Sequence, residues 1–344
     1  MGNTLSKGSL FPPQLTNEMF NLVRGKSSLA RLSASVPLQF NGNSMFTFNM
    51  DNEVDLVAEN GAKSNGGATI APVSMQPVKI EYGVRVSDEF RYASEEIQLN
   101  YLRAFAEGFA SKTARGLDIM AFHGVNPRTG LTASVLTNRN FDDLVTSTVT
   151  YDASAPDANI TTAIAAINAL EHDVTGLAVA PAFKAALANM KTQTGSNVPL
   201  FPGLGWGSNV TDLNGLPFDS NSTVSFSGAV DRAIVGNFAD FFRWGYAREI
   251  PIEIIEYGNP DNSELGDLKG HNQVYIRGEA YIGWGILVPE AFERIIYVPE
   301  ETGGETGGET GGETGGETGG ETGGETGGET GGETGGETGG GTTG

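Results

Sequence analysis

The chain contains no cysteine and only three histidines, and none of its apolar runs is long. Without cysteine it has no disulfide framework, no thiolate metal site and no cysteine nucleophile. A membrane-spanning helix needs about 18 or more mostly apolar residues, so we predict no membrane association. The first residues also lack the apolar segment of a secretion signal, which favours a protein that stays in the cell where it is made.

Positive charge is scarce as well. The chain has 21 Lys and Arg residues against 42 Asp and Glu residues, a formal net charge of −21, and its isoelectric point is near 4.4. Proteins that hold nucleic acid by neutralising phosphates need clustered Lys and Arg, which displace the counterions of the nucleic acid. The composition therefore argues against a protein that binds DNA directly.

Residues 1–35 depart from this acidic average. Four basic residues, Lys7, Arg24, Lys26 and Arg31, outnumber the single acidic residue Glu18. We predict an extended arm with one short helix, and its charge favours a position on another acidic surface. A solvated terminus is the alternative.

The last 44 residues are ten copies of Glu-Thr-Gly-Gly followed by Gly-Thr-Thr-Gly. This segment has no apolar side chain to bury, and half of its repeat is glycine, so burial cannot offset the entropy lost on ordering. We predict a disordered tail at 299–344. The 300 residues that precede the repeat have ordinary globular composition and suffice for one large domain or two smaller ones.

Residues 36–86 alternate apolar and polar side chains with the period of a β-strand. The alternation covers 46–50, 54–58 and 78–86, and a polar, glycine-rich stretch at 59–68 separates the segments. We predict a long two-stranded excursion with a glycine-rich tip. Such a ribbon is marginally stable unless it packs on something else.

A long helix is predicted at 94–123. Ser94 is a suitable N-cap, with two glutamates directly after it. Apolar residues then recur every four positions, beginning at Ile97 and Tyr101, and the pattern ends before Gly124. At 1.5 Å per residue the helix would be roughly 40 Å long.

A separate α/β module is predicted at 155–272. It begins with an apolar helical stripe at 160–170, a short buried strand at 177–181 and a second helix at 183–190. Glycine-rich loops and further strands follow. The alternating run at 273–284 predicts a closing strand, and the ordered body should end near Val298.

The sequence offers little for catalysis. His123, His172 and His271 stand in no metal-ligand spacing, and nucleophile-elbow and phosphate-loop motifs are absent. Acidic pairs such as 142–143 are expected by chance in so acidic a chain and favour solvated surface. We predict no catalytic, cofactor or metal site, and no enzyme.

The order of these segments resembles the major capsid protein of tailed bacteriophages, the Hong Kong 97 type. The matching motifs span nearly the whole body, and each is degenerate, so the specificity lies in their order and spacing. They are KGSLFPP at 7–13, VAENGAK at 57–63, VRVSDEF at 84–90, LANMK at 187–191, LNGLPF at 213–218, VGNF at 235–238 and the closing block at 272–292.

The resemblance implies an α+β fold of four ordered parts before the tail. These are an N-terminal arm at 1–35, an extended loop at 36–86, a peripheral domain at 87–154 and 273–298 with a spine helix at 94–123, and an axial domain at 155–272. Assembly contacts are expected at Lys7, Arg24, Lys26 and Arg31 of the arm and at Glu59 and Lys63 of the loop.

Some relatives join subunits by an isopeptide bond. Lys63 is a candidate by position, but its partner cannot be matched, so we do not predict the bond.

The resemblance also implies a function. Copies would form pentamers and hexamers that close into an icosahedral shell around double-stranded DNA, enclosed without sequence-specific binding. A separate scaffolding protein, a portal and a decoration protein are possible partners. The protein would reside in the virion after assembly in the host bacterial cytoplasm.

Three other readings stay open from sequence. An encapsulin-like compartment shell shares the fold and would package a protein cargo. A secreted surface adhesin with a glycine-rich spacer would require export. A hydrolase with paired carboxylates would require two acids to meet in a cleft with perturbed pKa values.

Overall fold

A computed structural model describes residues 27–193, 195–205, 210–248 and 252–299. The predicted contacts at Lys7, Arg24 and Lys26, and the predicted disordered tail, lie outside these residues. Within the described ranges, no helix is both long enough and apolar enough to cross a membrane.

The long helix is α4, Glu95–His123, which confirms the helix predicted at 94–123. Ser94 stands at the N-cap position with extended backbone, although its side chain does not cap the helix. Gly124 ends the helix in the left-handed region, at φ 62°, and donates its N–H to the carbonyl of Met120. Glycine adopts this conformation without the strain that a Cβ would cause, so the helix ends where the sequence indicates.

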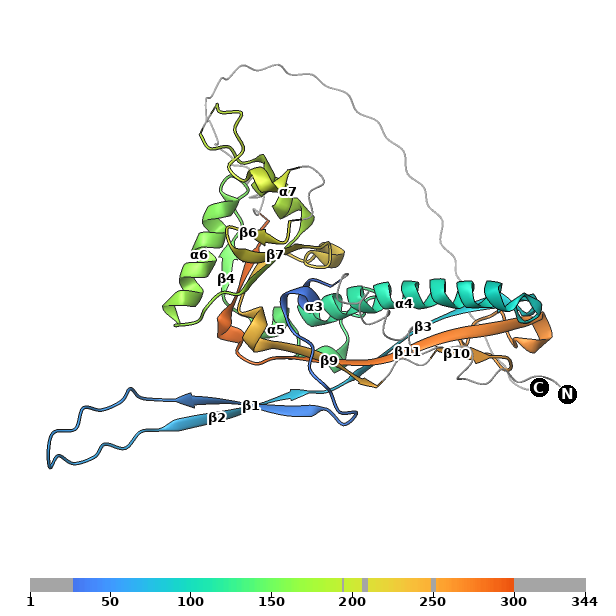
Figure 1. The fold of residues 1–344 in the computed structure, drawn as a ribbon, viewed down its shortest axis with the longest axis horizontal. Helices are drawn as coiled ribbons and strands as arrows, with labels where there is room; N and C mark the ends of the chain where they lie inside the picture. The colour runs from blue at the N-terminus through green and yellow to red at the C-terminus, as the bar shows by residue number, and fades with distance from the viewer. Residues whose placement is uncertain (1–26, 194, 206–209, 249–251, 300–344) are drawn as a thin grey trace, which may run out of the picture. The chain divides into compact units, whose positions relative to one another are not determined.

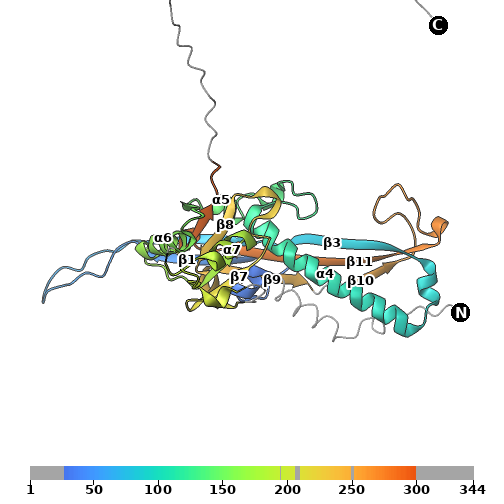
Figure 2. The same ribbon diagram turned by 90° about the horizontal axis from the view of Figure 1, so that it is seen from above.

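Helix α4 runs along a four-stranded sheet (Figures 1 and 2). The central strand β11, Gln273–Ile286, pairs along ten residues with β3, Val78–Ser87. Its other edge pairs with β10, Ile252–Ile255, and with β9, Phe242–Arg248. The predicted strand at 273–284 is therefore confirmed and lies inside a sheet rather than at its edge.

The strand predictions for residues 36–86 were partly wrong. The hairpin joins β1, Asn43–Met50, to β2, Ala68–Met75. No strand forms at 54–58, where Val54 and Leu56 are almost fully exposed. Alternation alone cannot supply a hydrogen-bonding partner, and β1 finds its partner in the less regular segment after the glycines. The third segment, at 78–86, belongs to β3 and leaves the hairpin for the four-stranded sheet.

A six-stranded sheet forms the second layer. Its order is β4, Thr148–Thr150; β12, Phe292–Ile296; β8, Asp231–Gly236; β5, Gly176–Val179; β7, Leu216–Ser220; and β6, Asp212–Leu213. The helices α6, Pro156–Ala169, and α7, Pro181–Asn189, pack on it through the cluster that includes Ile167, Phe183 and Leu187. These elements confirm the helices and the buried strand predicted between 160 and 190.

Strand β12 was missing from the sequence prediction. After β11 the chain turns through the 3-10 helix η6, Pro289–Ala291, and enters the six-stranded sheet between β4 and β8. Residues 273–298 therefore contribute to both sheets. This segment therefore connects the two sheets, whereas the sequence prediction assigned it to the peripheral domain alone.

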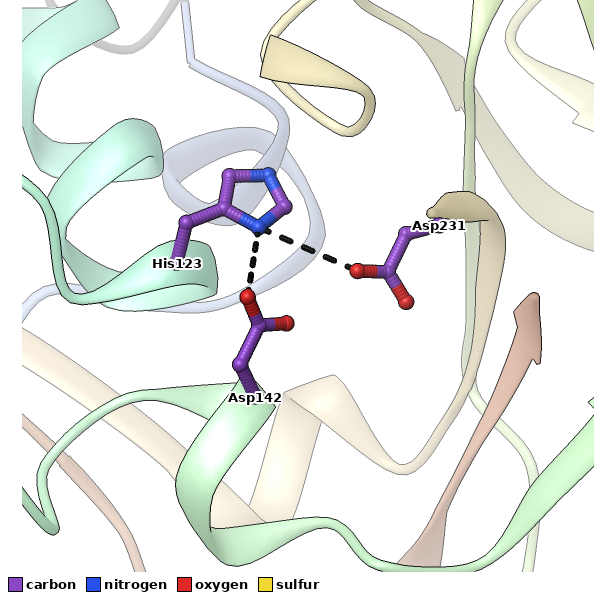
Figure 3. A group of neighbouring side chains, drawn as sticks. All are labelled: His123, Asp142 and Asp231. Carbon is purple, nitrogen blue, oxygen red and sulfur yellow. Dashed lines mark hydrogen bonds and ion pairs between the residues drawn. The ribbon is translucent and has the colours of Figure 1, made fainter. Parts of the chain in front are cut away.

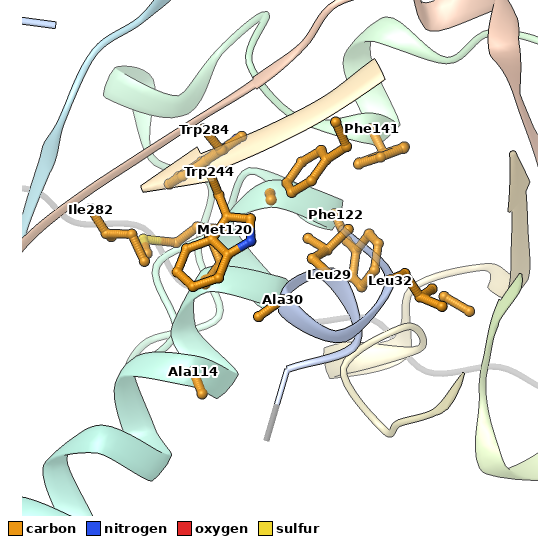
Figure 4. Packing of buried hydrophobic residues seen from close by; sticks show 14 of the residues in the cluster. Leu29, Ala30, Leu32, Ala114, Met120, Phe122, Phe141, Trp244, Ile282 and Trp284 are labelled. Atoms are coloured by element: carbon orange, nitrogen blue, oxygen red, sulfur yellow. The ribbon is translucent and has the colours of Figure 1, made fainter. Parts of the chain in front are cut away.

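A second hydrophobic cluster lies between α4 and the four-stranded sheet (Figure 4). Phe141 begins the short helix α5, Phe141–Leu144, and its ring centroid lies 5.5 Å from Phe122, 5.8 Å from Phe242 and 5.1 Å from Phe292. The short helix α3, Ser28–Leu32, packs Leu29, Ala30 and Leu32 into the same cluster. The last part of the predicted arm is therefore part of the core.

Two glycines give a matched test of this packing. A Cβ on Gly245 would overlap the backbone carbonyl oxygen of Val36, whereas a Cβ on Gly108 of α4 would meet nothing within 4 Å. We expect Gly245→Ala to destabilise the chain by about 1–3 kcal/mol because backbone must move. Gly108→Ala should stabilise it by about 1 kcal/mol through helix propensity. Chemical denaturation of both variants measures this, and equal effects would contradict the packing described.

Candidate functional site

The β1–β2 hairpin carries an uncovered apolar face. Residues opposite one another in an antiparallel pair share a face, and three such pairs are Phe46 with Pro72, Phe48 with Ile70, and Met50 with Ala68. All six are exposed, and Phe46, Phe48, Met50 and Ile70 keep 68%, 61%, 70% and 60% of their accessible surface. We call these six residues the hairpin face. Contiguous exposed apolar surface of this kind marks an interaction site.

The two loop residues predicted to make assembly contacts lie at the end of the hairpin where β1 connects to β2. Glu59 and Lys63 are exposed in the connection between β1 and β2. Asn60 between them adopts a left-handed conformation, at φ 63°, and the N–H of Gly61 bonds to the carbonyl of Ala58. Glu59 therefore lies in the turn at 58–61 and Lys63 lies two residues beyond it, and their assembly role stays a prediction.

Arg31 has a partner in its own chain. Its Nη1 lies 2.5 Å from Oδ1 of Asp219, and the hydroxyl of Ser28 donates to Oδ2 of the same carboxylate at 2.5 Å. At this residue the basic side chain of the arm is paired with a carboxylate of its own chain. The intersubunit role of Arg31 stays a prediction.

Asp118 of α4 holds the first residues of α3. Its fully buried carboxylate accepts the N–H of Ser28 at 2.9 Å, the N–H of Leu29 at 3.2 Å and the hydroxyl of Ser27. The hydroxyl of Thr223 donates to Oδ2 at 2.9 Å. Burial raises the pKa of Asp118 to about 6, against the opposing effect of these hydrogen bonds. A negative charge at a helix N-terminus is favourable, so the contact fixes α3 on α4.

A buried charge cluster forms where α4 ends (Figure 3). Nδ1 of His123 lies 3.0 Å from Oδ2 of Asp142 and 3.8 Å from Oδ2 of Asp231. Arg294 of β12 donates from Nε and Nη2 to the two oxygens of Asp231, at 2.8 and 2.9 Å, and from Nη2 to Asp142 at 2.6 Å. We call these four residues the His123 cluster. It ties α4, α5, β8 and β12 together.

Burial and ion pairing shift the pKa values of the groups in this cluster in opposite directions. Burial lowers the pKa of His123, but the hydrogen bond to Asp142 and the charges of Asp142 and Asp231 outweigh it, so the pKa is raised. For Asp142 burial raises the pKa, and the hydrogen bond and charge of His123 with the charge of Arg294 bring it below its ordinary value. For Asp231 burial dominates and raises the pKa, while Arg294 opposes this. The bidentate contact with Arg294 identifies Asp231 as a carboxylate.

The cluster has the donor atoms of a metal site but not its charge. One ligand atom each from His123, Asp142 and Asp231 lies within 4.8 Å of the others. The guanidinium of Arg294 already occupies both carboxylates, and with a protonated His123 the two positive charges balance the two negative ones. A divalent ion would leave an excess positive charge in a buried place, which is costly. The geometry therefore favours a structural ion network.

Sequence reasoning missed this cluster. It assigned Asp142 to solvated surface because an acidic neighbour follows it, and it found no ligand spacing around His123; the Asp142 assignment was wrong. Contacts that span 63 residues, from Arg294 to Asp231, and 152 residues, from Arg294 to Asp142, leave no local pattern. The hairpin face did leave a signal, the alternation at 46–50, although the sequence did not reveal that it would stay uncovered.

The two sheets, the long helix and the uncovered hairpin together form an α+β subunit with an exposed apolar face. The model of the Phage capsid family matches residues 7–296, and the chain belongs to this family. It is a capsid shell protein of the α+β, Hong Kong 97 type, from a family of structural proteins that form the virion capsid.

Solved structures support this assignment. A chain from Mycobacterium phage Ogopogo is 31% identical, with a TM-score of 0.68 over 79% of this chain and 92% of that chain. A chain from Gordonia phage Cozz is 24% identical, with a TM-score of 0.67 over 80% of this chain and 87% of that one. A structure described as the capsid of an empty GTA particle is 12% identical, with a TM-score of 0.58 over 80% and 90% of the two chains. The last two show the fold alone. No curated protein matches the sequence.

Proposed function

We propose that this chain assembles into pentamers and hexamers that close into an icosahedral phage head around double-stranded DNA. Membership of the Phage capsid family supports shell formation. The proposal adds the capsomer types and the enclosed genome. In it, residues 155–272 lie around the centre of each capsomer, and residues 87–154 with 273–298 form its periphery.

The hairpin face is the observation that carries the proposal. A two-stranded ribbon alone is marginally stable in water, and here one of its faces is apolar and exposed over the three pairs nearest the hairpin connection. Because the segment is part of a shell protein, the occupant we assign to this face is a sister copy. Each copy would then both give and receive one hairpin, and the many modest contacts of a closed shell would reinforce one another.

Charge supports enclosure of DNA without direct binding. The net charge of −21 cannot neutralise phosphates, so the genome would have to be pushed into the shell and held there by its closure. A portal would serve as the entry, a separate scaffolding protein would direct assembly, and a decoration protein could bind outside. Assembly would take place in the host bacterial cytoplasm.

Electron microscopy of the purified full chain, expressed alone and with its neighbouring genes, tests the proposal. We expect closed particles with five-fold and six-fold capsomers in at least the co-expressed sample. A chain that sediments as a folded monomer under both conditions would contradict it. Shells that instead enclose a protein encoded nearby would indicate the encapsulin-like compartment.

A further inference from the structure

The His123 cluster and the Asp118 contact form one continuous network. Nε2 of His123 lies 2.9 Å from the carbonyl oxygen of Thr223, and the hydroxyl of the same Thr223 donates to Asp118 at 2.9 Å. Asp118 in turn accepts two backbone N–H groups at the start of α3. A single path of polar contacts thus runs from β12, through the end of α4, to α3 near the end of the predicted arm.

The hydrogen bonds of His123 determine where its protons are. A backbone carbonyl can only accept, so Nε2 must carry a hydrogen that it donates to Thr223. In a neutral imidazole the other nitrogen, Nδ1, would then present a lone pair to Asp142 at 3.0 Å and to Asp231 at 3.8 Å. Two carboxylates repel that lone pair, whereas an N–H at Nδ1 satisfies both the hydrogen bond and the charge.

We propose that His123 is held as a buried imidazolium and that its second proton is a structural part of the subunit, joining the end of α4 to the six-stranded sheet and to α3. Losing this proton leaves two carboxylates against one guanidinium. The polar contacts among α4, α5, β8 and β12 then weaken. Because Thr223 binds both His123 and Asp118, the contacts that hold α3 weaken as well. The inference is independent of shell formation, because every contact in it lies within one chain.

The groups that face His123 set the direction of the pH effect. Asp142 comes from α5, Asp231 from β8 and Arg294 from β12, and the charge of Asp143 also reaches Arg294. A histidine with a raised pKa in the folded state contributes stability that is fully present below about pH 6.5, its unfolded value. That contribution is lost as the pH rises through the higher folded value.

Asp118 titrates at a lower pH than His123. Its pKa is raised to about 6, so its effect on stability changes between its ordinary value near 3.8 and about pH 6, below the range in which His123 acts. Loss of stability above pH 6.5 therefore reports on His123 and not on Asp118.

Deuterium exchange at the histidine C2 position, read by mass spectrometry, tests the proton directly on the full chain. The chain has three histidines, so His172 and His271 provide internal references in every sample. We expect His123 to exchange slowly, because it is buried, and to titrate above pH 6.5. A midpoint at or below that value would overturn the proposal, whether or not the chain forms shells.

A variant tests the consequence for the fold. His123→Gln cannot carry the charge, so its unfolding midpoint should lack the decline that we expect for the unchanged chain above pH 6.5. The matched control His271→Gln, at an exposed residue, should keep that decline. After correction for the intrinsic base-catalysed exchange rate, the amide protection of residues 28–32 should fall as the pH rises in the unchanged chain but not in His123→Gln. Parallel pH profiles for the chain and His123→Gln would contradict a structural proton.

The same samples separate a proton from a metal ion. If the unfolding midpoint rises with added zinc chloride, falls with EDTA, and responds to neither in His123→Gln, the site holds a divalent ion and the proposal is wrong. No response to either reagent, together with a His123 midpoint above pH 6.5, supports the buried proton.

Discussion

Replacing Phe48 by aspartate is expected to prevent the formation of closed shells and to leave the isolated subunit folded. Phe48 lies in the middle of the hairpin face, paired with Ile70, and is 61% exposed in the single chain. The substitution should therefore change the free energy of unfolding of the isolated subunit little. Each interface would lose about 1.5–3 kcal/mol of Phe burial, at least about a tenfold weakening. It would also have to desolvate a carboxylate.

Asn49→Asp provides the matched control. Asn49 is the next residue of β1, is exposed, and lies on the opposite face of the hairpin, where it pairs with Thr69. The two variants add the same charge to opposite faces of the hairpin, and only Phe48→Asp also removes an apolar side chain from the hairpin face. Sedimentation and electron microscopy should show shells for Asn49→Asp and small species for Phe48→Asp. Equal assembly of both would mean that the hairpin face is not the contact between copies.

The largest loss of stability is expected for Arg294→Met. Arg294 makes the bidentate contact with Asp231, which is fully buried, and also binds Asp142. Methionine fills much of the same space without charge, so the variant leaves two carboxylates with one partner, His123. Removing one member of a buried ion pair costs about 3–5 kcal/mol, which we expect to measure by chemical denaturation of the unassembled chain.

Two further variants check that the cost comes from charge. Arg103→Met makes the same substitution at an exposed ion pair on α4, with Glu107, and should change stability little. Adding Asp231→Asn to Arg294→Met removes one orphaned charge and should restore part of the lost stability. If the double variant were no more stable than Arg294→Met, the packing of the arginine side chain would be its main contribution.

The helix at 94–123 and the hairpin show how far local patterns extend. The helix could be predicted to within a residue, because its cap position, its four-residue apolar spacing and the ending glycine all act between neighbours in sequence. The hairpin was predicted in outline, but its second strand was placed wrongly. Strand pairing depends on which distant segment supplies hydrogen bonds, and alternation at 54–58 carries no such information.

The predicted assembly residues show a different limit. Arg31 was chosen for its charge, and it pairs with Asp219 in the same chain. Glu59 and Lys63 were chosen from the motif at 57–63, and both are exposed in the connection between the two strands of the hairpin. Side-chain charge identified these residues as candidates, whereas their partners depended on contacts that sequence order does not reveal. Their part in assembly stays a prediction.

The sequence by itself determined the class of fold, the long helix, the absence of cysteine chemistry and the acidic charge that argues against direct DNA binding. The class of fold follows from the resemblance in the order and spacing of motifs along the body, and the other three properties follow from composition and from interactions between residues a few positions apart. The tertiary structure decided that β12 joins the second sheet, that one hairpin face stays uncovered, and that His123, Asp142, Asp231 and Arg294 meet. These features arise when packing brings together segments up to about 150 residues apart, where burial makes each charge depend on its partners.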